Sequence, residues 1–88
     1  MNSNIPGGII QGELPNEVLN FIKNKLKPNY KILNISNVKT QIVSGIMYYF
    51  DVKILNSTNC QINKYSVSIW AQPWMSPPYK IQKIISQP

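Results

Sequence analysis

The chain has 88 residues and a formal net charge of +6, carried by nine lysines against Glu13, Glu17 and Asp51, and it contains neither arginine nor histidine. This length suits one small domain with a single core, since domains usually run from roughly 50 to 250 residues. Without histidine there is no Ser-His-Asp triad, Cys-His pair or imidazole metal site, and three scattered carboxylates make a poor acid pair. We therefore expect no enzyme, no metal site and no cofactor.

The cysteine count and the apolar runs indicate a compartment. Cys60 is the only cysteine, so it cannot form an internal disulfide, and this favours a reducing environment. The first residues show no secretory pattern, and no apolar run approaches the ~20 residues of a membrane span. We expect a soluble cytoplasmic protein in which Cys60 lies in a polar loop, with no basic neighbour nearer in sequence than Lys64, and is an unreactive bystander.

The N-terminal third predicts an arm followed by one helix. Residues 1–12 hold three of the four glycines and are typical of an extended arm. From Leu14 onward, apolar residues recur every four positions, which predicts an amphipathic helix over residues 14–27. Pro15 suits the first turn of this helix and Pro28 ends it.

After the helix the hydrophobic period changes to two, which predicts an antiparallel meander over residues 30–86. The alternation breaks phase near Leu33, as a β-bulge would require, and it is cleanest from Ile46 to Ile54. A later strand ends at Pro73, which cannot donate to a sheet. The side chains assigned to the core face of the sheet are Tyr48, Phe50, Val52, Tyr65, Val67 and Ile69.

These elements add up to an α+β fold in which one N-terminal helix packs across a four- to five-stranded antiparallel sheet, within a single domain spanning residues 1–88. In such a meander, the turn at Gly45 and the loop that begins at Pro73 lie at the same end of the sheet. Each signal has a plain alternative: Gly45 also reads as an ordinary turn glycine, Trp74 as a core aromatic, and Gly7 with Gly8 as a flexible tail.

Three segments taken together resemble the cystatins, and in particular the stefins, the small intracellular branch without disulfides. The segments are Ile5-Pro6-Gly7-Gly8, Gln41-Ile42-Val43-Ser44-Gly45 and Pro73-Trp74. The helix and the strand after Gly45 also resemble those of the family, so the resemblance covers most of the chain. Pro73-Trp74 is similar to the second binding loop of secreted and plant cystatins, which mammalian stefins lack, so features of two branches are combined.

This resemblance implies the cystatin fold and reversible, tight inhibition of papain-like, cathepsin-type cysteine proteases. The arm and the two hairpin loops would enter the active-site cleft together. The residues that the resemblance places in contact with the protease are Ile5, Pro6, Gly7, Gly8, Gln41, Ile42, Val43, Ser44, Gly45, Pro73 and Trp74. We expect a monomer, and a dimer formed by exchange of the arm, helix and first long strand is compatible with the topology.

Two other functions are compatible with parts of the sequence. A nucleic-acid-binding module would pair the lysines with aromatic side chains, but the lysines are spread along the chain and no arginine can read a base edge. A cystatin fold that has lost inhibition and serves as an interaction module is the other, since fold alone does not determine function. The intact segment from Gln41 to Gly45 favours inhibition, and we expect neither nucleic acid nor a membrane as a partner.

Overall fold

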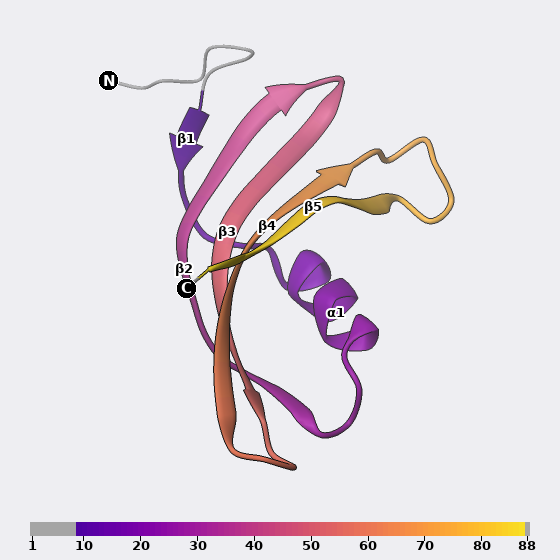
Figure 1. Ribbon diagram of the computed structural model, residues 1–88. Helices are drawn as coiled ribbons and strands as arrows, with labels where there is room; N and C mark the ends of the chain where they lie inside the picture. The colour runs from indigo at the N-terminus through magenta and orange to yellow at the C-terminus, as the bar shows by residue number, and fades with distance from the viewer. Residues whose placement is uncertain (1–8, 88) are drawn as a thin grey trace.

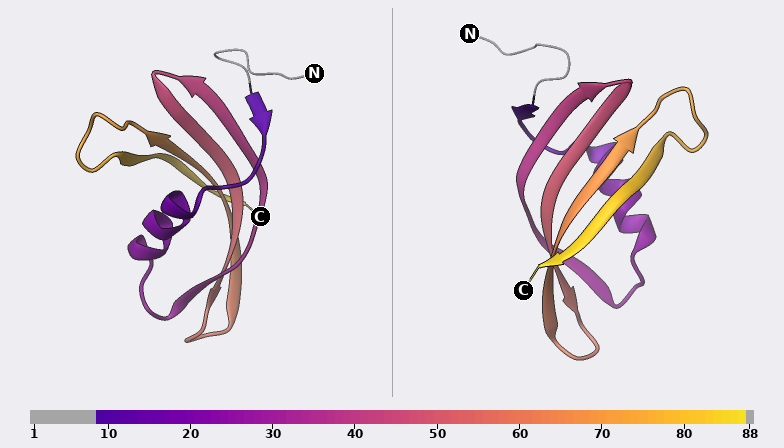
Figure 2. Two further views of the ribbon diagram at one scale, coloured as in Figure 1. Left: turned by 180° about the vertical axis from the view of Figure 1, so that it is seen from behind. Right: turned by 45° about the horizontal axis from the view of Figure 1, so that its top comes forward.

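The computed structural model describes residues 9–87 as one curved antiparallel sheet with a single helix on its concave face (Figure 1). Five strands lie in the order β1-β2-β3-β4-β5, so each strand pairs with its neighbour in sequence. The elements are β1 (Ile9–Gln11), α1 (Asn16–Lys25), β2 (Tyr30–Val43), β3 (Gly45–Asn56), β4 (Gln61–Ala71) and β5 (Tyr79–Gln87). The α+β expectation is confirmed, and Figure 2 shows that α1 covers only one face of the sheet.

Helix α1 is shorter at each end than the expected span of 14–27. Pro15 is its N-cap, in an extended conformation, and Leu26 is its C-cap. A proline disfavours helical geometry in the residue before it, so Pro28 explains why the helix has ended before Lys27. Among the described residues, no helix is long and apolar enough to cross a membrane.

Strand β1 lies inside the segment that was expected to be only an extended arm. It pairs antiparallel with β2, with Ile9 opposite Gln41 and Gln11 opposite Lys39. The N–H of Gly12 continues this ladder by donating to the carbonyl oxygen of Val38 at 3.2 Å. Residues 1–8, which hold most of the predicted arm, lie outside the described residues.

Strand β2 carries two irregularities, of which the sequence predicts one. The expected bulge near Leu33 is confirmed by a shift in register between Ile32 and Asn34. A second shift follows between Ser36 and Lys39, where Asn37 has a φ of 54°. Asparagine tolerates this left-handed conformation better than most residues do.

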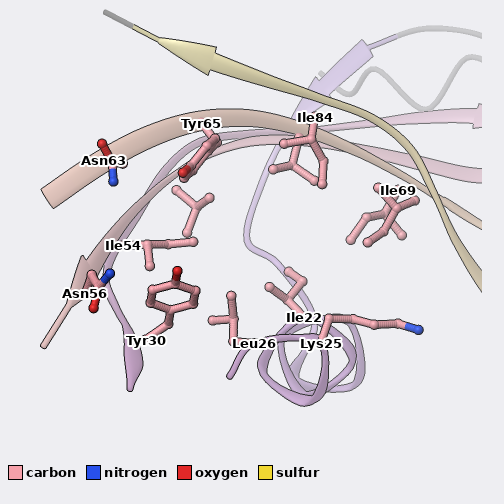
Figure 3. Close-up of a pocket in the computed structure, with 13 residues that line it drawn as sticks. Ile22, Lys25, Leu26, Tyr30, Ile54, Asn56, Asn63, Tyr65, Ile69 and Ile84 are labelled. Carbon is pink, nitrogen blue, oxygen red and sulfur yellow. The ribbon is translucent and has the colours of Figure 1, made fainter. Parts of the chain in front are cut away.

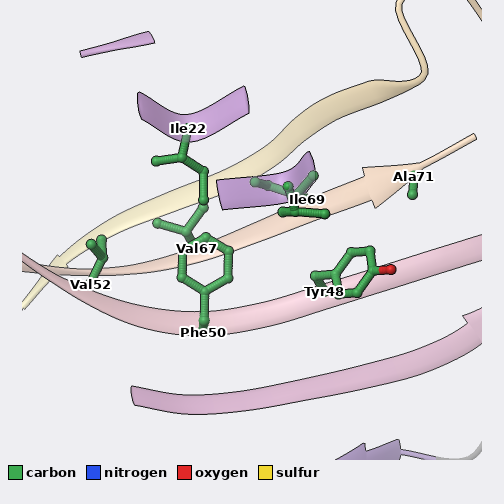
Figure 4. Packing of buried hydrophobic residues seen from close by; sticks show 8 residues of the cluster. Ile22, Tyr48, Phe50, Val52, Val67, Ile69 and Ala71 are labelled. Carbon is green, nitrogen blue, oxygen red and sulfur yellow. The ribbon is translucent and has the colours of Figure 1, made fainter. Parts of the chain in front are cut away.

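The core lies between α1 and the concave face of the sheet (Figure 4). Its buried side chains are Val18, Ile22, Tyr48, Phe50, Val52, Val67, Ile69 and Ala71. Five of the six residues that alternation assigned to this face are buried, and the sixth, Tyr65, is partly buried against them. The period-two pattern therefore located the face of the sheet that α1 covers.

Candidate functional site

Two loops lie at one end of the sheet, which is the upper end in Figure 1. The first is the turn at Ser44 between β2 and β3, and the second is the segment 72–78 between β4 and β5. Ile9 pairs with Gln41, two residues before β2 ends, so β1 begins at this same end. We call the residues 42–46 and 72–75 the loop edge.

Gly45 is required by the conformation of the first loop. Its φ of +92° lies in the left-handed region, which side chains with a Cβ rarely adopt. A Cβ on this residue would also collide with the carbonyl oxygen of Ala71 on the neighbouring strand. The glycine thus makes the turn and lets β3 approach β4 closely.

The second loop is held by its own backbone and brings Trp74 to the first loop. The N–H of Gln72 donates to the carbonyl oxygen of Pro78 at 2.6 Å, and the N–H of Met75 donates to that of Gln72 at 2.9 Å. A ring carbon of Trp74 lies 3.3 Å from the place that a Cβ of Gly45 would occupy. Trp74 is 58% exposed, so it is a surface aromatic and not a core residue.

Trp70 ties strand β4 to the first loop, and sequence reasoning missed it. Its indole N–H donates to the carbonyl oxygen of Ser44 at 2.7 Å, which ties β4 to the tip of the β2–β3 turn. Alternation placed Trp70 on the outer face of its strand, and the register agrees, because it pairs with Met47 of the outer row. The partner is a backbone carbonyl 26 residues away, so local sequence carries no signal for this bond.

Gln41 lies two residues before the end of β2, and its side chain is hydrogen-bonded to the next strand. The hydroxyl of Tyr49 on β3 donates to its Oε1 atom at 2.7 Å, and Gln41 is only partly exposed. The side chain of Gln41, one of the predicted contact residues, is therefore held in place by strand β3. Tyr49 is a second positioning residue that the sequence did not single out.

The loop edge is apolar and uncharged. Its exposed hydrophobic side chains come from both loops and are Ile42, Val43, Ile46, Trp74 and Met75. Ser44 and Pro73 are exposed between them. No aspartate, glutamate or lysine occurs in either segment of the loop edge, so burying it against another protein would leave no charge without a partner.

The structure therefore brings Gln41 to Gly45 together with Pro73 and Trp74, as the meander predicts. The four remaining predicted contact residues, Ile5 to Gly8, lie outside the described residues. Their contact roles, like those of the residues in the loops, stay predictions.

A separate cavity of about 300 Å³ opens between the C-terminal half of α1 and the concave face of the sheet. Figure 3 shows Leu26 and Tyr30 on one side of it and Ile54, Tyr65 and Ile84 on the other. Of the predicted contact residues that the structure describes, none lines this cavity. Its lining is mostly apolar and also includes Lys25, Asn56 and Asn63.

The other side chains that could carry a functional site would be a metal-binding group and the cysteine. Within residues 9–87, no group of three or more cysteine and acidic side chains could hold a metal ion. Cys60 is free and exposed in the β3–β4 turn, at the end of the sheet opposite the loop edge. The loop edge, with its exposed apolar side chains, is therefore the candidate functional site.

Comparison with known proteins gives two matches. The cystatin domain family matches residues 18–77, a range that includes most of α1, the whole β2–β3 turn and most of the segment between β4 and β5. A cystatin-like protein of Drosophila melanogaster is 33% identical over 48 residues, which cover 54% of this chain and 36% of that protein. The matched region thus spans about a third of the relative's length. No solved structure matches.

Proposed function

This chain belongs to the cystatin family, a family of cysteine protease inhibitors and not of enzymes, and from that premise we propose that it is a reversible, tight-binding inhibitor of papain-like proteases. The loop edge is the surface that would enter the active-site cleft. The arm residues Ile5 to Gly8 would lie beside it, along the non-primed specificity pockets, with Gly7 as a hinge.

The observation that carries this proposal is the contact between the two loops. Trp74 rests against Gly45, and Trp70 bonds to Ser44, so the loops form one surface before any partner arrives. A surface that is already ordered loses less conformational freedom when it binds. This preorganisation favours a wedge that fits a cleft over a pair of independent loops.

The chemistry of the loop edge suits a narrow protease cleft. Gly45 and Pro73 carry no bulky polar side chain, so the backbone of the two loops can approach the walls of the cleft closely. Trp74 offers a large, rigid contact, and tryptophan is one of the residues that most often dominate interface energy. The nucleophile would be covered without receiving a peptide bond in a cleavable geometry.

Finer features belong to the same proposal. We place the chain near the stefin-like, type 1 branch, acting as a cytoplasmic monomer on cathepsin-type proteases. The arm, which resembles the stefin N-terminal segment, and the single cysteine support that branch, while Pro73-Trp74 is a feature of other cystatins. A dimer that exchanges α1 and β2 would have to open the β2–β3 turn. The first loop of the loop edge would then no longer be available to bind a protease.

A titration of papain tests the proposal. Purified protein is added to a known amount of papain in reducing buffer with a small fluorogenic substrate, and activity is measured before and after dilution. We expect a stoichiometric loss of activity that dilution reverses. No inhibition at micromolar protein would leave the fold in place and make the chain a non-inhibitory cystatin domain.

Substitution of Trp74 locates the contact. Trp74→Ala should weaken papain binding by more than about 1 kcal/mol, or roughly fivefold or more, while the fold is kept because the side chain is mostly exposed. Ile62→Ala is the matched control, since Ile62 is 55% exposed near the opposite end of the sheet. Equal affinities for the two variants would remove Trp74 from the binding surface.

A further inference from the structure

The convex face of the sheet, opposite α1, gathers most of the positive charge of the chain. Side chains alternate between the two faces of a strand, and the strand register shows which lysines share this convex face. They are Lys31, Lys39, Lys53, Lys64, Lys80 and Lys83, and all six are exposed. Lysines that are spread along the sequence are thus collected on one surface by the fold.

Acidic residues neutralise little of the positive charge on the convex face. Glu13 precedes α1 and Glu17 lies in its first turn, so Asp51 is the single acid of the sequence on the convex face. Six lysines against one carboxylate leave a net charge of +5 there. The Asp51 carboxylate accepts hydrogen bonds from Asn37 at 2.7 Å and Ser66 at 2.8 Å, so neutral groups occupy much of its capacity.

One lysine pair is placed at a cost to stability. Lys53 on β3 is directly opposite Lys64 on β4. Like charges in this position repel each other and destabilise a sheet. Asp51 interacts electrostatically with Lys64 and offsets part of this repulsion. An anionic partner lying over both lysine side chains would relieve the rest, so this pair adds to the case for a bound anion.

The layout of the face identifies the kind of anion. From the row of Leu55 to the row of Met47 the face runs roughly 27 Å along the strands, and β2 to β5 spans roughly 14 Å across them. Two exposed isoleucines stand among the lysines, Ile62 and Ile85, the latter 48% exposed. A broad, outward-curving, basic surface with apolar side chains suits a lipid headgroup layer, whereas single-stranded nucleic acid usually follows a basic groove.

We propose that the convex face docks on an anionic lipid bilayer, with the lysines at the phosphate level and Ile62 and Ile85 reaching into the interface. This docking revises the expectation of no membrane partner. The docking surface and the loop edge are largely separate, because the loop edge lies at the end of the sheet (Figure 2), and they meet at the row of Met47, where Gln41 shares the convex face. A chain bound in this way keeps its loop edge open to a protease.

Vesicle binding tests the proposal with the full chain. The protein is mixed with phosphatidylcholine vesicles and with vesicles in which a third of the lipid is phosphatidylserine, and bound protein is separated by sedimentation. Lys53→Gln/Lys64→Gln is compared with Lys23→Gln/Lys27→Gln, which removes the same charge from α1 and the turn after it. Circular dichroism confirms folding, and Lys80→Gln/Lys83→Gln serves as a second convex-face pair.

We expect binding only to the acidic vesicles, weakening as salt rises, and reduced at least about tenfold by either convex-face pair but less than about twofold by the helix-side pair. No binding to acidic vesicles, or equal losses for all three variants, would overturn the proposal. A single-stranded oligonucleotide that binds more tightly than the acidic vesicles, and loses affinity in the same convex-face variants, would overturn it in favour of a nucleic acid. Papain inhibition by the convex-face variants should be unchanged.

Discussion

Replacing Gly45 by alanine should damage both the fold and the loop edge. The residue has a φ of +92°, and the added Cβ would meet the carbonyl oxygen of Ala71. The nearest side chains are the two indole rings of the site, with Trp70 Nε1 at 3.2 Å and a Trp74 ring carbon at 3.3 Å. Any shift that relieves the clash must therefore move β4 or the two tryptophans.

The expected loss of stability follows from these contacts. The left-handed conformation costs an L-residue roughly 1–2 kcal/mol, and the clash with a backbone atom adds to it. We expect a total of at least about 2 kcal/mol, which lowers Tm by about 8–16 °C in a domain of this size. Thermal and urea unfolding followed by circular dichroism give this value, and papain inhibition of the folded fraction reports the displacement of Trp74.

Gly12→Ala is the matched control, because nothing lies within 4 Å of the place that its Cβ would occupy. It should change stability by less than about 1 kcal/mol and leave inhibition intact. A Gly45→Ala variant with the Tm and papain affinity of the unmodified chain would refute the close approach of the two loops.

Two further substitutions probe single hydrogen bonds. Trp70→Phe keeps an aromatic ring but removes the N–H that donates to Ser44, so papain should dissociate about fivefold faster, with Tm changed by only a few degrees; an unchanged dissociation rate would show that the bond does not order the loops. The pKa of Asp51 is lowered from its ordinary value near 3.8, chiefly by the hydrogen bond from Asn37 and next by that from Ser66. Because the pKa of Asp51 is lower in the folded chain than in the unfolded chain, the ionised carboxylate stabilises the fold at pH values above the ordinary pKa. This contribution to stability is lost as the pH falls through the lowered pKa. Urea unfolding should therefore show the stability advantage over Asp51→Asn shrinking from about pH 5 to pH 2, and a constant difference would contradict this.

Local patterns predicted the elements and the packed face because those features depend on near neighbours in sequence. The period of two placed Phe50, Val67 and Ile69 toward the helix, and a break in phase located the irregularity at Leu33. Prolines lie at both boundaries of the helix, but the helix is shorter than the apolar period indicated. Pro15 is its N-cap and not part of its first turn, and the helix ends at Lys25, before Pro28.

Features that depend on distant partners left no local signal. Strand β1 has three residues and is defined by its pairing with β2, and the irregularity at Asn37 accompanies a bond to Asp51, 14 residues away. Trp70 reaches a carbonyl in another turn. The basic convex face arises in the same way, because only the register of four strands shows that lysines such as Lys39 and Lys83 share a surface.

If the loop edge occupies the active-site cleft of a papain-like protease, a ligand that already fills the cleft must compete with this chain. The most direct measurement is the affinity of the chain for papain, by fluorescence anisotropy of protein labelled at Cys60, before and after a small covalent inhibitor has filled the cleft. Cys60 is exposed at the opposite end of the sheet, so the label does not touch the loop edge. We predict that filling the cleft abolishes or greatly weakens binding, whereas equal affinity for open and filled papain would contradict the account.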